Sequence, residues 1–304
     1  MRTMDDQATT SLPVEEDGEP LAGSVKRYER HLAVCTGGPP ELWAARVEEM
    51  EGLFGALHAA LRVRRLHKQV KLTACDAPST GWEGFDVFLL PDMLVLPALT
   101  VEKVGALADA LQGGGDLPIV ATPLPAGDHV FVCHHANRDL RCGTWGPRFY
   151  AALERELMEQ RVPAHLHRSS HLGGHRFAAV SIIYPEGVWY GNLRPDDAPR
   201  LVSEHLVHRR LLPDKYRGRL GSSPCEQVAE AEAARVLARD YGDYTDLRVA
   251  VREHGQVARV LATASVPGPR GPVGVSAEFA LFCPTVWWTP DEEPIFASDC
   301  ESPS

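Results

Sequence analysis

The chain has 304 residues, more than a typical single domain, and this length predicts two domains or three small ones. Its composition, with 44% hydrophobic and 24% charged residues, is that of an ordinary globular protein. The net charge of -10 is spread along the chain and argues against nucleic acid or an anionic membrane as a partner.

Residues 1–25 are acidic, lack periodic apolar positions and are predicted to be a flexible segment. They contain no apolar stretch of the kind found in a signal peptide. No later run of the sequence is apolar for long enough to span a membrane. We therefore expect a cytoplasmic protein with no membrane partner.

Residues 26–112 have the pattern of a thioredoxin-like half. The order of predicted elements is a strand, a helix, a strand, a pair of strands and a final helix, at residues 31–35, 42–61, 68–75, 85–96 and 101–111. The order strand–helix–strand followed by strand–strand–helix is that of a thioredoxin-like fold.

Residues 129–210 repeat the same order after a segment at 113–128 that has the Gly- and Pro-rich composition of a linker. The elements of this second half are predicted at residues 129–133, 145–160, 162–167, 177–191 and beyond Pro195. Cys35 aligns with Cys133 when the halves are superimposed by sequence, which indicates a duplication.

Residues 211–304 are predicted to form a third unit. Ser223 and Pro224 are typical of a helix start, and this helix is expected to run to Tyr241. Three alternating runs after it predict a small antiparallel sheet. The predicted fold is thus α/β (α+β), with two tandem thioredoxin-like halves and a C-terminal helix and sheet.

Two short motifs of the second half contain residues that suggest chemistry. Cys133 and Cys142 form a Cys-x8-Cys pair, and they are the only close pair among seven cysteines. His171 and His175 form a His-x-Gly-Gly-His pair, whose two glycines predict a loop that wraps closely around something. Two cysteines and two histidines suit either tetrahedral zinc or an iron–sulfur cluster. The gap between the cysteines is longer than zinc sites usually have, which favours the cluster.

The sequence here resembles the sucrase/ferredoxin-like family of thioredoxin-like ferredoxins. The resemblance covers residues 18 to about 240 and rests on CHHANRDLRCGTWGP (133–147), SHLGGHRFAA (170–179) and YPEGVWYGNLRPDD (184–197). It implies a [2Fe–2S] cluster with Cys133 and Cys142 on one iron, and His171 and His175 on the other. His134-His135-Ala136 departs from the Thr-His-Gly that is common after the first cysteine of the family. No pair of carboxylates suggests glycoside hydrolysis, so a sucrase activity has no support.

The remaining histidines and cysteines have simpler interpretations. The first half cannot hold the same cluster, because Ala44 stands where the partner of Cys35 would be and no histidine pair precedes Phe85. We therefore interpret it as a degenerate copy. Four histidines near the motifs are interpreted as structural or as supporting the ligands: His134, His135, His165 and His167.

The functional expectation is a one-electron carrier that exchanges electrons with a reductase and an acceptor protein. Neutral imidazoles in place of thiolates make a cluster less negative, which raises its reduction potential, and they couple electron transfer to protons. A structural or regulatory zinc protein on the same four residues and a cluster-based redox sensor remain alternatives. A thiol–disulfide enzyme is disfavoured, because the chain lacks Cys-x2-Cys. Whether it acts as a stand-alone enzyme and its oligomeric state stay open.

Overall fold

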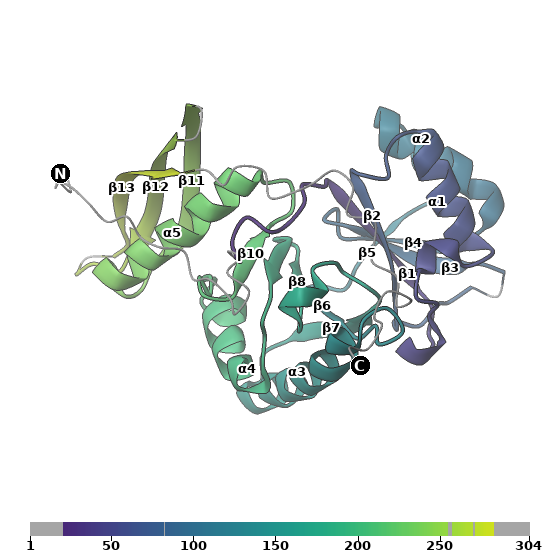
Figure 1. Ribbon diagram of the computed structural model, residues 1–304, viewed down its shortest axis with the longest axis horizontal. Coiled ribbons are helices and arrows are strands. Elements are labelled where there is room, and N and C mark those ends of the chain that lie inside the picture. Colours follow the sequence, from purple (N-terminus) through teal and green to yellow (C-terminus); the bar gives the residue numbers. More distant parts are fainter. Residues whose placement is uncertain (1–20, 82, 255–256, 270, 283–304) are drawn as a thin grey trace, which may run out of the picture.

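The computed structural model describes residues 21–81, 83–254, 257–269 and 271–282. In these residues the chain forms a ten-stranded mixed sheet and a separate three-stranded antiparallel sheet (Figure 1). Most of the segment predicted to be flexible, 1–25, lies outside the described residues, as does 283–304 at the end of the C-terminal unit. No helix of the described residues is long and apolar enough to cross a membrane.

The first half has the strand order β2-β1-β3-β4, with β1 parallel to β2 and antiparallel to β3. A two-residue strand from the segment predicted to be a linker, β5 (Thr122–Pro123), adds to β4. The helices α1 and α2 pack on the outer face of the half (Figure 1). The elements are β1 (Arg30–Cys35), α1 (Leu53–Val63), β2 (Val70–Cys75), β3 (Phe85–Leu90), β4 (Leu94–Leu99) and α2 (Val104–Gly113).

The second half repeats this arrangement with the strand order β7-β6-β8-β9. Again the first two strands are parallel and the next pairings are antiparallel. Its elements are β6 (Asp128–Cys133), α3 (Leu140–Gln160), β7 (Ala164–Ser169), β8 (Ser181–Tyr184), β9 (Val188–Tyr190) and α4 (Ala198–Arg200), which continues as a π-helix over Leu201–Val207. The predicted repeat of a thioredoxin-like fold is confirmed, since both halves share order and direction.

Two helices begin at other residues than the sequence predicted. Helix α3 begins at Leu140 and not at Trp145, because the Asp139 side chain accepts a hydrogen bond from the Arg141 amide and caps the helix. Helix α1 begins only at Leu53, after two short 3-10 turns and a glycine, Gly52, with φ of 72°.

The two halves share one sheet, which the sequence did not predict. Strands β2 and β7 meet antiparallel, with Cys75 opposite Ser169. A buried core of side chains from both halves fills the space between them. In this core the His31 ring lies 3.0 Å from the Tyr184 hydroxyl, although the two strands are separated by several others in the sheet. The sheet is therefore folded over, so that its inner face packs against itself.

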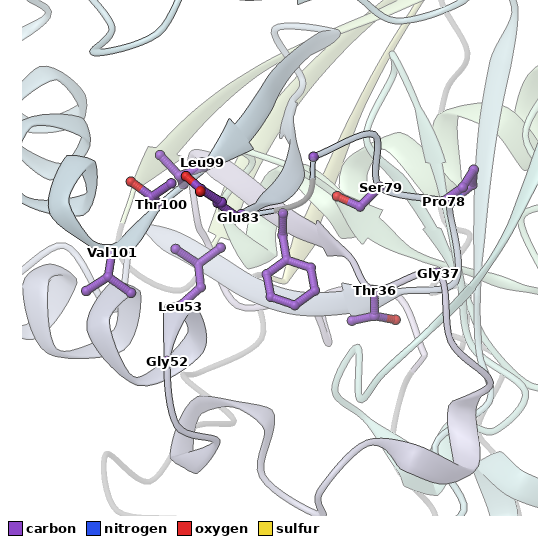
Figure 2. A pocket seen from close by; sticks show the side chains of 13 residues that line it. Thr36, Gly37, Gly52, Leu53, Pro78, Ser79, Glu83, Leu99, Thr100 and Val101 are labelled. Atoms are coloured by element: carbon purple, nitrogen blue, oxygen red, sulfur yellow. The ribbon is translucent and has the colours of Figure 1, made fainter.

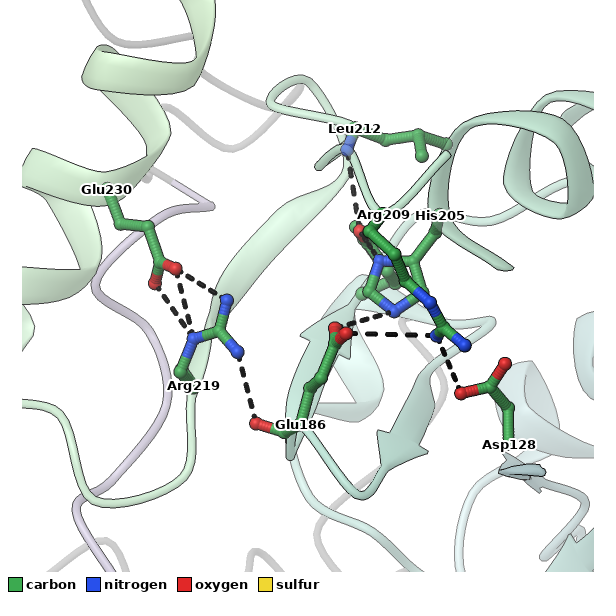
Figure 3. Close-up of polar contacts among 8 residues, drawn as sticks. Asp128, Glu186, His205, Arg209, Leu212, Arg219 and Glu230 are labelled. Atoms are coloured by element: carbon green, nitrogen blue, oxygen red, sulfur yellow. Dashed lines mark hydrogen bonds and ion pairs between the residues drawn. The ribbon is translucent and has the colours of Figure 1, made fainter. Parts of the chain in front are cut away.

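The C-terminal unit consists of α5 (Pro224–Tyr241) and the strands β11 (Thr245–His254), β12 (Val257–Val266) and β13 (Val273–Phe282). Ser223 caps α5 as the sequence predicted. The large sheet also takes in β10 (Tyr216–Arg219), beyond the expected end of the second half at residue 210. Arg219 of β10 forms an ion pair of 2.6 Å with Glu230 of α5 (Figure 3). This contact links the C-terminal unit to the second half.

Candidate metal centre

The two cysteines of the Cys-x8-Cys motif lie side by side in the folded protein. Cys133 is the last residue of β6, and Cys142 lies in the first turn of α3. Both are free thiols and 1% exposed. Helix α3 approaches the strand closely at Gly146, where a Cβ atom would overlap the Cys133 carbonyl. The absence of a side chain at this glycine therefore allows the two thiols to meet.

The histidine loop, residues 171–175, brings its imidazoles to the same place. One side-chain ligand atom from each of Cys133, Cys142 and His171 falls within 4.8 Å of the others, the only such group found in the part of the chain described. The His175 ring lies next to His171, with 5.4 Å between ring centroids. The four residues that the sequence singled out are thus neighbours, although the ligand atom of His175 is not part of the tight group of three.

Both histidines have a nitrogen that lacks a partner. The Nδ1 atoms of His171 and His175 are buried and make no hydrogen bond to any residue that the structure describes. A buried polar atom without a partner is costly, and such atoms mark places where an ion or another group binds. Two thiols and two unsatisfied imidazole nitrogens make a donor set that fits a [2Fe–2S] cluster, and the same set would also take zinc.

The hydrogen bond between the two cysteines favours the thiolate at Cys133 and raises the pKa of Cys142, so in the absence of a metal the pair shares one proton. The pKa of Cys133 is held well below its usual value because Cys142 hydrogen-bonds its sulfur, against the effect of burial, and His171 adds a further hydrogen bond. Burial lowers the pKa of His175, while the Asp139 carboxylate, 3.8 Å from its Nε2, acts in the opposite direction. Metal ligands must be deprotonated, so the shifts at Cys133 and His175 are in the required direction.

Two neighbouring side chains hold the ligand loops in place. The His135 ring is fully buried, and its Nδ1 accepts a hydrogen bond from the His171 backbone amide at 3.0 Å. Its ring also packs edge-on against Trp43 of the first half, at 6.1 Å between centroids. Asn137 donates to the Trp43 carbonyl at 2.8 Å. The first half therefore forms one wall of the site, a role that no signal in the sequence indicated.

The other histidines near the motifs lie elsewhere. The Nδ1 of His134 hydrogen-bonds the Val132 carbonyl. His167 hydrogen-bonds His129, whose ring stacks on His165, and the rings of His129 and His167 contact Phe88 of the first half. Their partners give these histidines a structural role, in line with the interpretation from sequence.

The first half holds a different group of residues at the corresponding position. Its Cys35 contacts Cys75, with 3.8 Å between the sulfurs, and both are buried. Next to them, at the start of α1, is a cavity of about 680 Å³ whose lining contains neither cysteine nor histidine (Figure 2). The first half thus lacks the ligand set of the second, as expected of a degenerate copy.

The fold and the site together define a thioredoxin-like protein with a buried group of cysteine and histidine side chains. The Sucrase/ferredoxin-like family model matches residues 21–218, and the chain belongs to this family. The fold is assigned from the strand order of the two halves. A solved structure, the thioredoxin-like [2Fe–2S] ferredoxin from Aquifex aeolicus, is 20% identical and covers 33% of this chain and 97% of that one, with a TM-score of 0.28.

Similar proteins from yeasts bear the name Altered inheritance of mitochondria protein 32. The one from Clavispora lusitaniae is 34% identical over 227 residues, which cover 65% of this chain and 83% of that protein. The one from Meyerozyma guilliermondii is 33% identical over 94 residues, 29% of this chain and 33% of that protein. The match thus spans about a third of the length of one relative and most of the other.

This name contradicts the cytoplasmic location expected from the sequence, because it refers to mitochondria. The expectation rested on the lack of a long apolar stretch. Such a stretch is needed for secretion or for spanning a membrane, but its absence does not distinguish one soluble compartment of a cell from another.

Proposed function

We propose that this protein is an iron–sulfur redox protein in which Cys133, Cys142, His171 and His175 hold a [2Fe–2S] cluster. The observation that carries the proposal is the pair of unpartnered Nδ1 atoms of the histidines, buried beside two free thiols. When bound, such a cluster supplies a one-electron redox couple. The protein then carries single electrons between a reductase and an acceptor protein.

The two histidines set the redox properties in this proposal. A neutral imidazole contributes no negative charge, whereas a thiolate contributes one, so the reduction potential is higher than with four cysteines. Ligation of His175 through Nδ1 would leave its Nε2 atom free to carry a proton. In His175 this atom faces Asp139, which favours the protonated ring. Electron transfer is therefore coupled to protons at this imidazole.

Purification under anaerobic conditions tests the cofactor. We expect a red-brown protein that contains iron and acid-labile sulfide in equal amounts. Stoichiometric zinc without visible absorption would show that the same residues form a zinc site and would refute the proposal. A cluster that is lost reversibly on mild oxidation, with a change in partner binding, would identify a sensor and not a carrier.

Replacement of His175 by cysteine tests its role as a ligand. Thiolate is also a good ligand for iron, so His175→Cys should retain the cluster while the midpoint potential falls. The slope of potential against pH should also flatten, since one titrating imidazole contributes up to about 59 mV per pH unit in a one-electron couple. Protein-film voltammetry measures both quantities. If both are unchanged, His175 is not a ligand, and His135 would be the next residue to replace.

A further inference from the structure

Two positively charged side chains lie against the glycines of the histidine loop, outside the ligand set. Arg217 of β10 donates from Nη1 to the Gly173 carbonyl at 3.1 Å, and a Cβ atom at Gly174 would overlap its guanidinium group. The Nζ atom of Lys71, from β2 of the first half, lies 3.8 Å from the position that a Cβ atom of Gly173 would take. Because the two glycines have no side chains, the histidine loop leaves room for these two cations.

Among the residues that the structure describes, these cations have no carboxylate partner. Neither Lys71 nor Arg217 forms an ion pair within the described residues, whereas Arg219 on the same strand as Arg217 pairs with Glu230. Arg217 is 2% exposed, and its remaining hydrogen bonds go to the side chain and carbonyl of Ser24. Lys71 is partly buried. Buried charges without a counter-charge are strongly unfavourable, so this arrangement requires an anion nearby.

Aromatic rings fill the space around the two cations. The indole of Trp189 contacts both, with its ring centroid 5.2 Å from the Lys71 Nζ and 5.4 Å from the Arg217 guanidinium. Tyr28 lies 5.7 Å from Lys71, and Phe177 lies 4.9 Å from Arg217. Such faces attract a cation, but this attraction does not replace a full negative charge.

Among the groups that raise the pKa values of these two cations, the cysteines of the candidate site act most strongly. Burial lowers the pKa of Lys71 to about 8, and the strongest attraction that opposes this comes from Cys133, with a weaker one from Glu48. Burial likewise lowers the pKa of Arg217 to about 9, and Cys142 opposes it most. Deprotonation of these thiols, which binding of a metal requires, would therefore stabilise both cations beside the loop.

We propose that Lys71 and Arg217 are the counter-charges of the metal centre: they offset its thiolate charge, and Arg217 also positions the histidine loop. This inference rests on the proposed function. The two roles are separable, because Arg217 hydrogen-bonds the loop whereas Lys71 makes no hydrogen bond to it. Lys71 therefore acts by charge, and its removal makes addition of an electron to the centre less favourable.

The test compares Lys71→Met, Lys71→Arg and the wild-type full chain after anaerobic purification. Iron per chain and the midpoint potential from a spectroelectrochemical titration are measured for each. We expect a lower potential in K71M at similar iron content, and a potential close to that of the wild type in K71R. Lys103→Met is the matched control, because it removes the same charge from the first half in a turn before α2 and should leave the potential unchanged.

The outcomes separate the inference from the proposed function. An unchanged potential in K71M would overturn the inference, and so would equal loss of iron from K71M and K71R, which would indicate packing and not charge. Loss of iron from K71M that K71R restores would support it. A wild-type protein without iron and sulfide would instead refute the proposed function. For Arg217, we expect that Arg217→Gln loses iron and that Arg217→Lys retains it. Lysine keeps the charge and can still donate a hydrogen bond to the loop.

Discussion

Replacement of Gly174 by alanine is the sharpest single perturbation of the histidine loop. Its φ is 72°, in the left-handed region, where a residue with a Cβ atom is strained by about 1–2 kcal/mol. The new Cβ atom would also lie 2.6 Å from Cζ and 2.7 Å from Nη1 of Arg217, too close for real contacts. Arg217 is buried and held by three hydrogen bonds, so it cannot move aside freely.

The expected cost of Gly174→Ala follows from these two effects. Displacement of the guanidinium loses at least one hydrogen bond of a charged group, about 1.5–3 kcal/mol. Together with the backbone strain, the free energy of unfolding should fall by about 2.5–5 kcal/mol, a large part of the 5–15 kcal/mol typical of a domain. Urea denaturation of the metal-free protein measures this fall, and the iron content after anaerobic purification should fall as well.

Two control variants separate the effect of backbone strain from that of steric overlap with Arg217. Gly173→Ala has a positive φ of 103° but only the Lys71 Nζ atom near its Cβ position, at 3.8 Å, so it should cost only the strain. Gly115→Ala, where nothing lies within 4 Å, should cost nothing measurable. If Gly174→Ala is as stable as Gly115→Ala and retains its iron, the reasoning about Arg217 and the loop is wrong.

Two further predictions concern the cysteines and the stability in acid. Cys133→Ser should abolish or severely reduce iron and sulfide binding, whereas Cys35→Ser should spare it, because only Cys133 lies beside the histidine loop; metal analysis decides this. Burial lowers the pKa of His167 to about 3, and the repulsion from His129 adds to the shift. Below the unfolded-state pKa of about 6.5, His167 is protonated in the unfolded chain but stays neutral in the folded protein. Stability should therefore fall by about 3 kcal/mol between pH 6.5 and pH 4, and less in His167→Phe, as measured by urea unfolding at each pH.

Each of these predictions has a result that contradicts it. Loss of iron from Cys35→Ser would mean that the first half is not a degenerate copy. His167→Phe is expected to be less stable than the wild type at neutral pH, since His129 loses its hydrogen-bond partner, so the comparison concerns the slope with pH. An identical slope in both proteins would show that another group controls the loss of stability in acid.

The amino-acid sequence by itself determined the local elements and the ligand candidates. The alternation and helical spacing of apolar residues predicted the repeated thioredoxin-like order, and Ser223 followed by Pro224 predicted the start of α5. Cys133 and His171 were singled out because each belongs to a short motif whose residue types suit metal ligation, and the family resemblance implied their place in the ligand set. Such features depend on neighbours within a few residues, and these are visible in a linear sequence.

Only the tertiary structure decided how the two halves and the site fit together. The pairing of Cys75 with Ser169, which joins the halves into one sheet, involves strand edges that carry no distinctive sequence pattern. Lys71 and Arg217 lie 146 positions apart in the sequence, and nothing near either one marks it as a neighbour of the histidine loop. They meet there because the sheet folds over and brings β2 and β10 to the two glycines. Long-range packing and the cost of burying charge decide such contacts, and neither can be read from local pattern.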